Sequence, residues 1–134
     1  MNERKRMPDE RPSITKKLHI HYVNKEGQLE DVKIYIQVGL YPDTSLPGEI
    51  FLKSNHTGST ISGMLDALSM CISVALQAGV PLSWFIEKLK NLQFVPCGPT
   101  TDPKIKVATS IVDGVAKWLE YRFPPPDNQS TTLP

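Results

Sequence analysis

The 134-residue sequence has almost no surplus of either charge and no long apolar run, and both absences exclude classes of protein. Fifteen Lys and Arg residues face fourteen Asp and Glu residues, which leaves a net charge of +1. No overall field therefore favours nucleic acid or an anionic membrane. No apolar run approaches the roughly 20 residues that span a bilayer, and no signal peptide opens the chain. We expect a cytoplasmic protein that partners neither membrane nor nucleic acid.

Cysteine is scarce, and the residue patterns of common catalytic sites are missing. Cys71 and Cys97 are the only cysteines; they form no C-x-x-C pair, so we expect small buried thiols. No Ser-His-Asp or Cys-His pattern has local support. His19 and His21 form an H-x-H motif without evident further ligands. The sequence therefore predicts no catalytic residue, no metal site and no cofactor.

The composition of the two ends differs from that of the middle. Residues 1–13 interleave basic and acidic side chains, and residues 124–134 are rich in Pro, Ser and Thr. Neither stretch carries enough apolar surface to support a packed core. We expect two disordered tails around a single folded domain at residues 14–123.

The first half of that domain has the period of two that is typical of strands. Apolar and polar residues alternate in "KLHIHYV" (17–23), in "DVKIYIQVGLY" (31–41) and, more briefly, in "EIFLK" (49–53). The turn formers "NKEGQ" and "YPDTSLPGE" separate these stretches. This spacing predicts an antiparallel β-meander of about three or more strands.

After residue 53 the apolar period changes to that of a helix. Ser59 or Thr60 can cap a helix that runs to about Gln77, with Gly79 placed as its left-handed stop. A second helix fits "PLSWFIEKLKNL" (81–92), and Asp102 before a proline predicts the start of a third. Strands followed by helices predict an α+β fold with three helices packed on one sheet face.

The helix at residues 60–77 raises a specific question. Apolar residues occur nearly all round it, which predicts that it is buried. One stripe is polar, because Ser62, Asp66, Ser69 and Ser73 share a face, and a lone buried carboxylate there would need a partner. The stripe could meet another helix or a second copy of the chain, form the wall of a ligand pocket, or face solvent.

The start of the same helix is a candidate anion site. Gly58, Ser59 and Thr60 stand where backbone N–H groups lack helical partners and the helix dipole is positive. Such a turn can hold a phosphate or carboxylate, although Ser and Thr are also ordinary capping residues. Residues that could add positive charge are Lys53, His56 and Arg122.

Five stretches resemble, in the same order, a known family. They are "RMPDERPSITKKLHI", "VGLYPDTSLPGEIFL", "GSTISGMLDALSMCISVALQAGVPLSWFIEKL", "QFVPCG" and "SIVDGVAKWL". Together they are similar to the C-terminal region, called the TSCPD domain, of adenosylcobalamin-dependent (class II) ribonucleotide reductases. The resemblance covers about residues 6–120.

This resemblance implies a fold more than a reaction. The family's reductase activity belongs to a large barrel with a thiyl-radical cysteine and to a cobalamin site, and neither fits in 134 residues. The family's C-terminal cysteine pair is also absent, since the chain ends "PPPDNQSTTLP". The resemblance therefore implies that the chain is not itself an enzyme.

Two classes of function remain open. The first is a non-catalytic module that binds a nucleotide or another phosphorylated ligand, as a homo-oligomer. It would be either accessory to a ribonucleotide reductase or a protein that sequesters a signalling nucleotide, as small phage-type proteins do. The second is a structural or protein-interaction module that oligomerises and has no small-molecule ligand.

Overall fold

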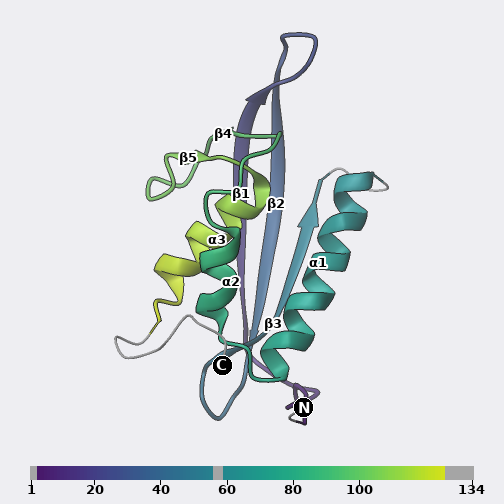
Figure 1. The fold of residues 1–134 in the computed structure, drawn as a ribbon, viewed down its shortest axis with the longest axis vertical. Helices are drawn as coiled ribbons and strands as arrows, with labels where there is room; N and C mark the ends of the chain where they lie inside the picture. The colour runs from purple at the N-terminus through teal and green to yellow at the C-terminus, as the bar shows by residue number, and fades with distance from the viewer. Residues whose placement is uncertain (1–2, 56–58, 126–134) are drawn as a thin grey trace. The chain divides into compact units, whose positions relative to one another are not determined.

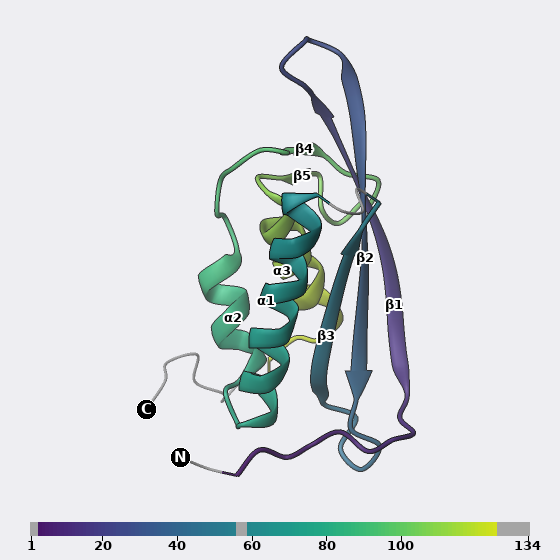
Figure 2. The same ribbon diagram turned by 90° about the vertical axis from the view of Figure 1, so that its right-hand side faces the viewer.

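A computed structural model describes residues 3–55 and 59–125, and its contacts divide the chain into two compact units (Figures 1 and 2). Unit 1 comprises Met1–Lys16 and Tyr35–Leu82, and unit 2 comprises Lys17–Ile34 and Ser83–Pro134. The elements in chain order are β1 (Ser13–Val23), β2 (Leu29–Leu40), β3 (Pro47–Ser54), α1 (Thr60–Gln77), α2 (Leu82–Leu89), β4 (Gly98–Pro99), β5 (Val107–Ala108) and α3 (Ile111–Arg122).

The predicted α+β fold is confirmed, because three antiparallel strands in the order β1-β2-β3 are followed by three helices. The alternation read from the sequence selects the buried face of each long strand. The side chains without exposed surface on this face are Leu18, Ile20, Val32, Ile34, Ile36, Val38 and Ile50. Their burial supplies the hydrophobic free energy that holds the sheet, at roughly 25 cal/mol for each Å² of apolar surface removed from water.

Unit 1 pairs β3 with α1, which lie side by side in both views (Figures 1 and 2). The predicted bounds of α1 are confirmed at both ends. The Ser59 hydroxyl accepts a hydrogen bond from the Ser62 backbone N–H at 3.2 Å, as an N-cap does. Beyond the C-terminus, Gly79 has a φ of +103°, a left-handed conformation that costs glycine little.

The charged segment at residues 3–12 has no helix or strand, but its side chains contact the body of unit 1. Arg11 forms a two-bond ion pair with Glu49, at 2.5 Å and 2.9 Å. Lys5 pairs with Asp43 at 3.1 Å, and the Tyr41 hydroxyl donates to the Lys5 carbonyl. The expectation that residues 1–13 and 124–134 are disordered tails stays a prediction. Of residues 124–134, only 124 and 125 are described.

Unit 2 contains two short strands that periodicity could not reveal. β4 pairs with β5 in an antiparallel register, with Gly98 opposite Ala108 and Pro99 opposite Val107. The chain after β4 then runs against β1, where Thr100 bridges to Ile20. At Gly98 an added Cβ would lie 1.9 Å from the His21 carbonyl oxygen, so only glycine allows this close approach.

The predicted start of the third helix is wrong, because α3 begins at Ile111 and not near Asp102. One Asp102 oxygen accepts from the Lys104 backbone N–H at 2.8 Å, and the other accepts from the Tyr121 hydroxyl. Asp102 therefore caps a turn and anchors α3 from outside the helix. Burial, together with the hydrogen bond to the Asp102 carboxylate, raises the pKa of Tyr121 to about 12. The N-cap of α3 is Ser110.

A buried carboxylate on the first turn of α3 joins three parts of unit 2. Asp113 has no exposed surface, and it accepts hydrogen bonds from the Asn91 N–H at 2.6 Å and the Thr109 N–H at 2.9 Å. The Lys117 ammonium lies 2.9 Å from it. Burial pushes the pKa of Asp113 up, but the hydrogen bonds from Lys117 and the two backbone N–H groups outweigh burial and hold this pKa below its ordinary value.

We predict that Asp113→Asn lowers the free energy of unfolding by about 2–3 kcal/mol at pH 7, since an amide cannot satisfy these three donors. The folded-state pKa of Asp113 lies below the unfolded one, so the carboxylate stabilises fully above the unfolded value of roughly 3.9. That stabilisation is lost as the pH falls through the folded value. Urea denaturation across pH 2–7 should show the difference between the two proteins shrinking toward acid.

The matched control for this prediction is Asp66→Asn, which removes a carboxylate from a half-exposed ion pair with Lys53. Solvent screens such a pair, so the control should denature at nearly the wild-type urea concentration. Equal destabilisation by the two substitutions would contradict a structural role for the Asp113 hydrogen bonds.

Candidate functional site

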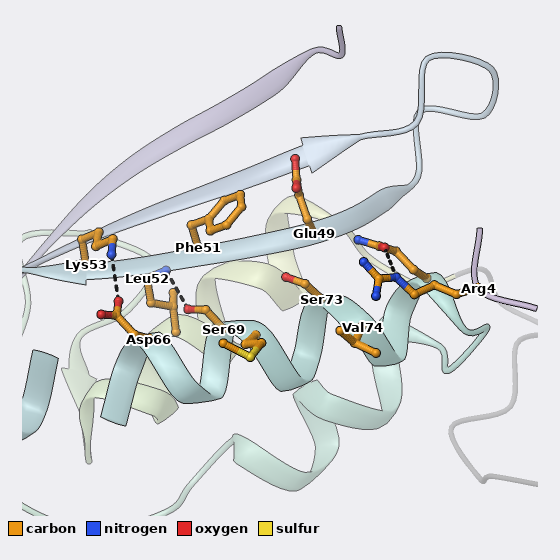
Figure 3. A pocket seen from close by; sticks show the side chains of 11 residues that line it. Arg4, Glu49, Phe51, Leu52, Lys53, Asp66, Ser69, Ser73 and Val74 are labelled. Carbon is orange, nitrogen blue, oxygen red and sulfur yellow. Dashed lines mark hydrogen bonds and ion pairs between the residues drawn. The ribbon is translucent and has the colours of Figure 1, made fainter. Parts of the chain in front are cut away.

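Part of the polar stripe of α1 faces the outer edge of β3, which is an edge strand of the sheet. The Ser69 hydroxyl accepts from the Leu52 N–H at 2.9 Å and donates to the Leu65 carbonyl, one helical turn earlier, at 2.7 Å (Figure 3). The N–H and C=O groups at the edge of a strand normally need a neighbouring strand as their hydrogen-bond partner. Here the Ser69 hydroxyl takes the place of that neighbouring strand as the partner of the Leu52 N–H.

Two further α1 side chains continue the same arrangement toward the helix C-terminus. The Ser73 hydroxyl accepts from the Ile50 N–H at 2.9 Å and donates to the Ile50 carbonyl at 3.0 Å. The Gln77 amide donates to the Gly48 carbonyl at 2.9 Å. Ser69, Ser73 and Gln77 recur every four residues and therefore match alternate residues of β3, since four helical rises and two strand rises have similar lengths, of roughly 6 Å each.

The remaining members of the stripe lie nearer the start of α1. Asp66 is 52% exposed and forms an ion pair with Lys53 at 2.8 Å, so it is not the buried charge that the apolar surroundings predicted. Ser62 is half-buried, and its backbone N–H is held by the N-cap.

The expectation that α1 is buried nearly all round is wrong, since only 22% of the helix is buried. The hydrogen bonds of Ser69 and Ser73 turn one side of α1 toward β3, and Leu65 and Ile72 are buried beside them. The opposite side of the helix, which is also apolar, faces outward. We call this exposed side the outer face of α1. It consists of Gly63, Met64, Ala67, Met70, Cys71 and Val74.

The outer face makes α1 unusual among helices of a small domain. By length and composition alone, α1 is apolar enough to cross a membrane, which was not predicted from the sequence. The core helices of soluble proteins pass the same test. Met64 and Met70 are 66% and 68% exposed, and Val74 is 40% exposed. Cys71 is exposed too, as is Cys97, so the expectation of two buried thiols is wrong.

A groove of about 380 Å³ runs beside the outer face, between α1 and the solvent face of β3 (Figure 3). Phe51 of β3 forms an apolar wall of the groove, and Met70 and Val74 line the groove from α1. Arg4, from the N-terminal segment, closes one end, and its Nε donates to the Gln77 amide oxygen at 2.8 Å. Asp66, Ser69 and Ser73 of the stripe also line this groove.

The proposed anion site at the start of α1 is only partly visible. His56 and Gly58 lie outside the described residues. Ser59 serves as the N-cap, and Lys53 is paired with Asp66. Arg122 belongs to unit 2, on the last turn of α3, where its guanidinium lies 5.0 Å from the centre of the Phe123 ring.

The H-x-H motif lies on β1 beside a carboxylate of β2. The Nδ1 atoms of His19 and His21 are 3.3 Å and 3.5 Å from the two oxygens of Asp31. In the described parts of the chain, no three His, Cys, Asp or Glu side chains gather as metal ligands would.

Seven residues that line the groove were not predicted from the sequence as site residues, namely Arg4, Glu49, Phe51, Leu52, Met70, Val74 and Gln77. Their signals were weak, because Arg4 sits in a charge-rich segment that reads as a solvated tail. The alternation in β3 does place Glu49, Phe51 and Lys53 on one face, but nothing in the sequence shows that a helix flanks that face.

Comparison with known proteins gives one consistent family. The family model described as the TSCPD domain matches residues 4–123. The chain is 42% identical over 127 residues to the vitamin B12-dependent ribonucleotide reductase of Streptomyces clavuligerus, which covers 95% of the chain and 12% of that protein. The corresponding protein of Rhodopirellula baltica is 41% identical over 120 residues, with 90% and 11% covered. No solved structure gives a significant match.

A more distant relative, the vitamin B12-dependent ribonucleotide reductase of Agrobacterium fabrum, is 31% identical over 122 residues, with 90% of the chain and 9% of that protein covered. The chain thus spans 9–12% of the length of these three relatives.

We predict that Ser69→Ala destabilises unit 1 by about 1–2 kcal/mol, because it leaves the buried Leu52 N–H without a partner. Hydrogen exchange read by NMR should show the Leu52 amide losing protection, while amides of α3 keep theirs. The control is Ser83→Ala, since the Ser83 hydroxyl oxygen is buried and accepts or donates no hydrogen bond in the described structure. That change should be neutral or stabilising, and an equal loss of stability in both variants would count against the role of Ser69.

Proposed function

Because the chain belongs to the TSCPD domain family and spans about a tenth of the reductases that it matches, we propose that it is a non-catalytic module that docks on a ribonucleotide reductase. The observation that carries this proposal is the outer face of α1, an apolar helix face that is left in solvent.

Several properties of that face favour a protein partner. Large contiguous apolar patches on soluble proteins mark interaction sites. Met64 and Met70 are flexible and polarisable, so they can adapt to a facing surface. Gly63 and Ala67 on the same face are small and allow a partner backbone to approach closely. The helix cannot turn this face inward, since Ser69 and Ser73 are bonded to β3 on its other side.

The partner that we propose is the large chain of a vitamin B12-dependent reductase. In the Streptomyces clavuligerus relative, the matching segment is 12% of a much longer protein, so it is covalently attached to a large body that can cover such a face. A module of this chain's size would need the same apolar contact to bind that body as a separate protein. A second copy of this chain is the other occupant that the face could accept.

Binding of a nucleotide or phosphate is a second candidate function. At the start of α1 its support is weak, because Ser59 caps the helix and Lys53 is neutralised by Asp66. The groove beside Phe51 gives it a better location, because an apolar wall and the Arg4 cation both line it.

We predict that Met64→Lys weakens binding to the reductase at least tenfold, because docking would bury a charge without a partner. Biolayer interferometry would measure the affinity of this chain for the Rhodopirellula baltica reductase, both intact and without the segment that matches this chain. We expect tighter binding to the shortened reductase, whose docking surface is vacant.

The matched control is Val107→Lys, since Val107 is 50% exposed and lies on β5 of unit 2. Equal affinity of the two lysine variants, or no binding to either form of the reductase, would defeat the docking proposal. Sedimentation velocity identifies the alternative occupant. A wild-type dimer that Met64→Lys converts to a monomer, without any reductase binding, would assign the face to a second copy.

A further inference from the structure

We propose that the groove between α1 and β3 binds an organic anion that carries a planar ring, a class that includes the nucleoside monophosphates. This binding site is separate from the docking function proposed above. The features that support it are the apolar wall at Phe51, which lies between Lys53 and Glu49 along the groove, and the cation Arg4 at one end (Figure 3).

The apolar wall suits a planar ring. Phe51 is 41% exposed on the solvent face of β3, and Met70 and Val74 approach the same space from α1. A ring could stack on the Phe51 face and contact the Met70 thioether at its edge. The groove volume of about 380 Å³ lies within the range of roughly 300–1,000 Å³ that small-molecule sites occupy.

Among the described residues that line the groove, Arg4 is the cation that is available to a ligand. Both oxygens of Glu49 are bonded to Arg11. The Asp66 carboxylate is bonded to Lys53. Arg4, by contrast, uses its Nε on the neutral amide of Gln77, so its positive charge is not compensated there. Among the described residues, the two carboxylates of the groove are thus each paired with a cation, Glu49 with Arg11 from outside the lining and Asp66 with Lys53, and the excess positive charge lies at Arg4.

The Gln77 amide also orients the Arg4 guanidinium. Its oxygen accepts from Arg4 while its nitrogen donates to the Gly48 carbonyl at 2.9 Å, which fixes the amide in one orientation. The hydrogen bond to Nε leaves the terminal nitrogens of Arg4 for the ligand. A guanidinium in this position can give two parallel hydrogen bonds to a phosphate or carboxylate. The anion is thus expected at Arg4 and the ring at Phe51.

Methionine NMR tests the location directly, because Met70 lines the groove while Met64 does not. With ¹³C-methyl-labelled methionine, titration with AMP should shift the Met70 methyl signal and leave the Met64 signal in place. Adenosine and inorganic phosphate, which each carry half of the recognised chemistry, should bind at least tenfold more weakly than AMP. Equal shifts of the two methyl signals, or phosphate binding as tightly as AMP, would overturn the proposal.

Two substitutions separate the ring from the charge. Arg4→Gln should weaken AMP binding at least tenfold and leave adenosine binding unchanged, because only the anion loses its partner. Phe51→Ala should weaken both. Arg122→Gln, which removes a cation from unit 2, is the control and should bind AMP like the wild type. Wild-type AMP affinity in Arg4→Gln would overturn the proposal.

The groove and docking proposals fail independently. Met64→Lys should bind AMP normally, and Arg4→Gln should bind the reductase normally. If AMP, UMP, adenosine and phosphate all leave the Met70 signal unchanged, the groove proposal is wrong whatever the reductase experiment shows. Circular dichroism and thermal unfolding would establish that each variant is folded, and Arg4→Lys, which keeps the charge without the fork, should retain part of the AMP affinity if Arg4→Gln unfolds.

Discussion

The backbone hydrogen bonds at the two edges of the three-stranded sheet are the constraint on which the rest of the structure depends. An open edge presents unpaired N–H and C=O groups and invites other chains to pair with it. Here each edge is covered by a different device. Side chains of α1 bond to β3 in unit 1, and the chain after Gly98 runs along β1 in unit 2, where the Thr101 N–H donates to the His19 carbonyl at 3.2 Å.

The hydrogen bonds between α1 and the edge of β3 determine which side of α1 is exposed. A helix that closes an edge with hydroxyl groups must turn those groups toward the strand, so the residues on its opposite side face away. The helix still packs Leu65 and Ile72 inward, as an amphipathic helix does, but it also leaves a second set of apolar residues in solvent. The stability gained from Ser69 and Ser73 therefore comes with an exposed apolar face, which a partner can bury.

Local signals in the sequence predicted the long strands and the bounds of α1, since alternation and capping depend on neighbouring residues. The orientation of α1 depends on residues about 20 positions apart, such as Ser73 and Ile50, and no periodicity contains it. At α3 the signal at Asp102 was misleading, because the Asp102 carboxylate is engaged by Lys104 and Tyr121, and Ser110 caps the helix instead. The groove escaped prediction because Arg4 comes from a segment that looks like a solvated tail.

The two proposed binding surfaces share residues, and this has a consequence for any regulation. Met70 and Val74 line the groove and also belong to the outer face of α1. A ligand that moves the Met70 side chain changes the surface that the partner meets, and in that case the two binding free energies are coupled. By linkage, the factor by which a ligand changes the affinity for the partner equals the factor by which the partner changes the affinity for the ligand. The coupling is positive if the partner needs the Met70 side chain in the position that the ligand selects, and negative if it needs another position.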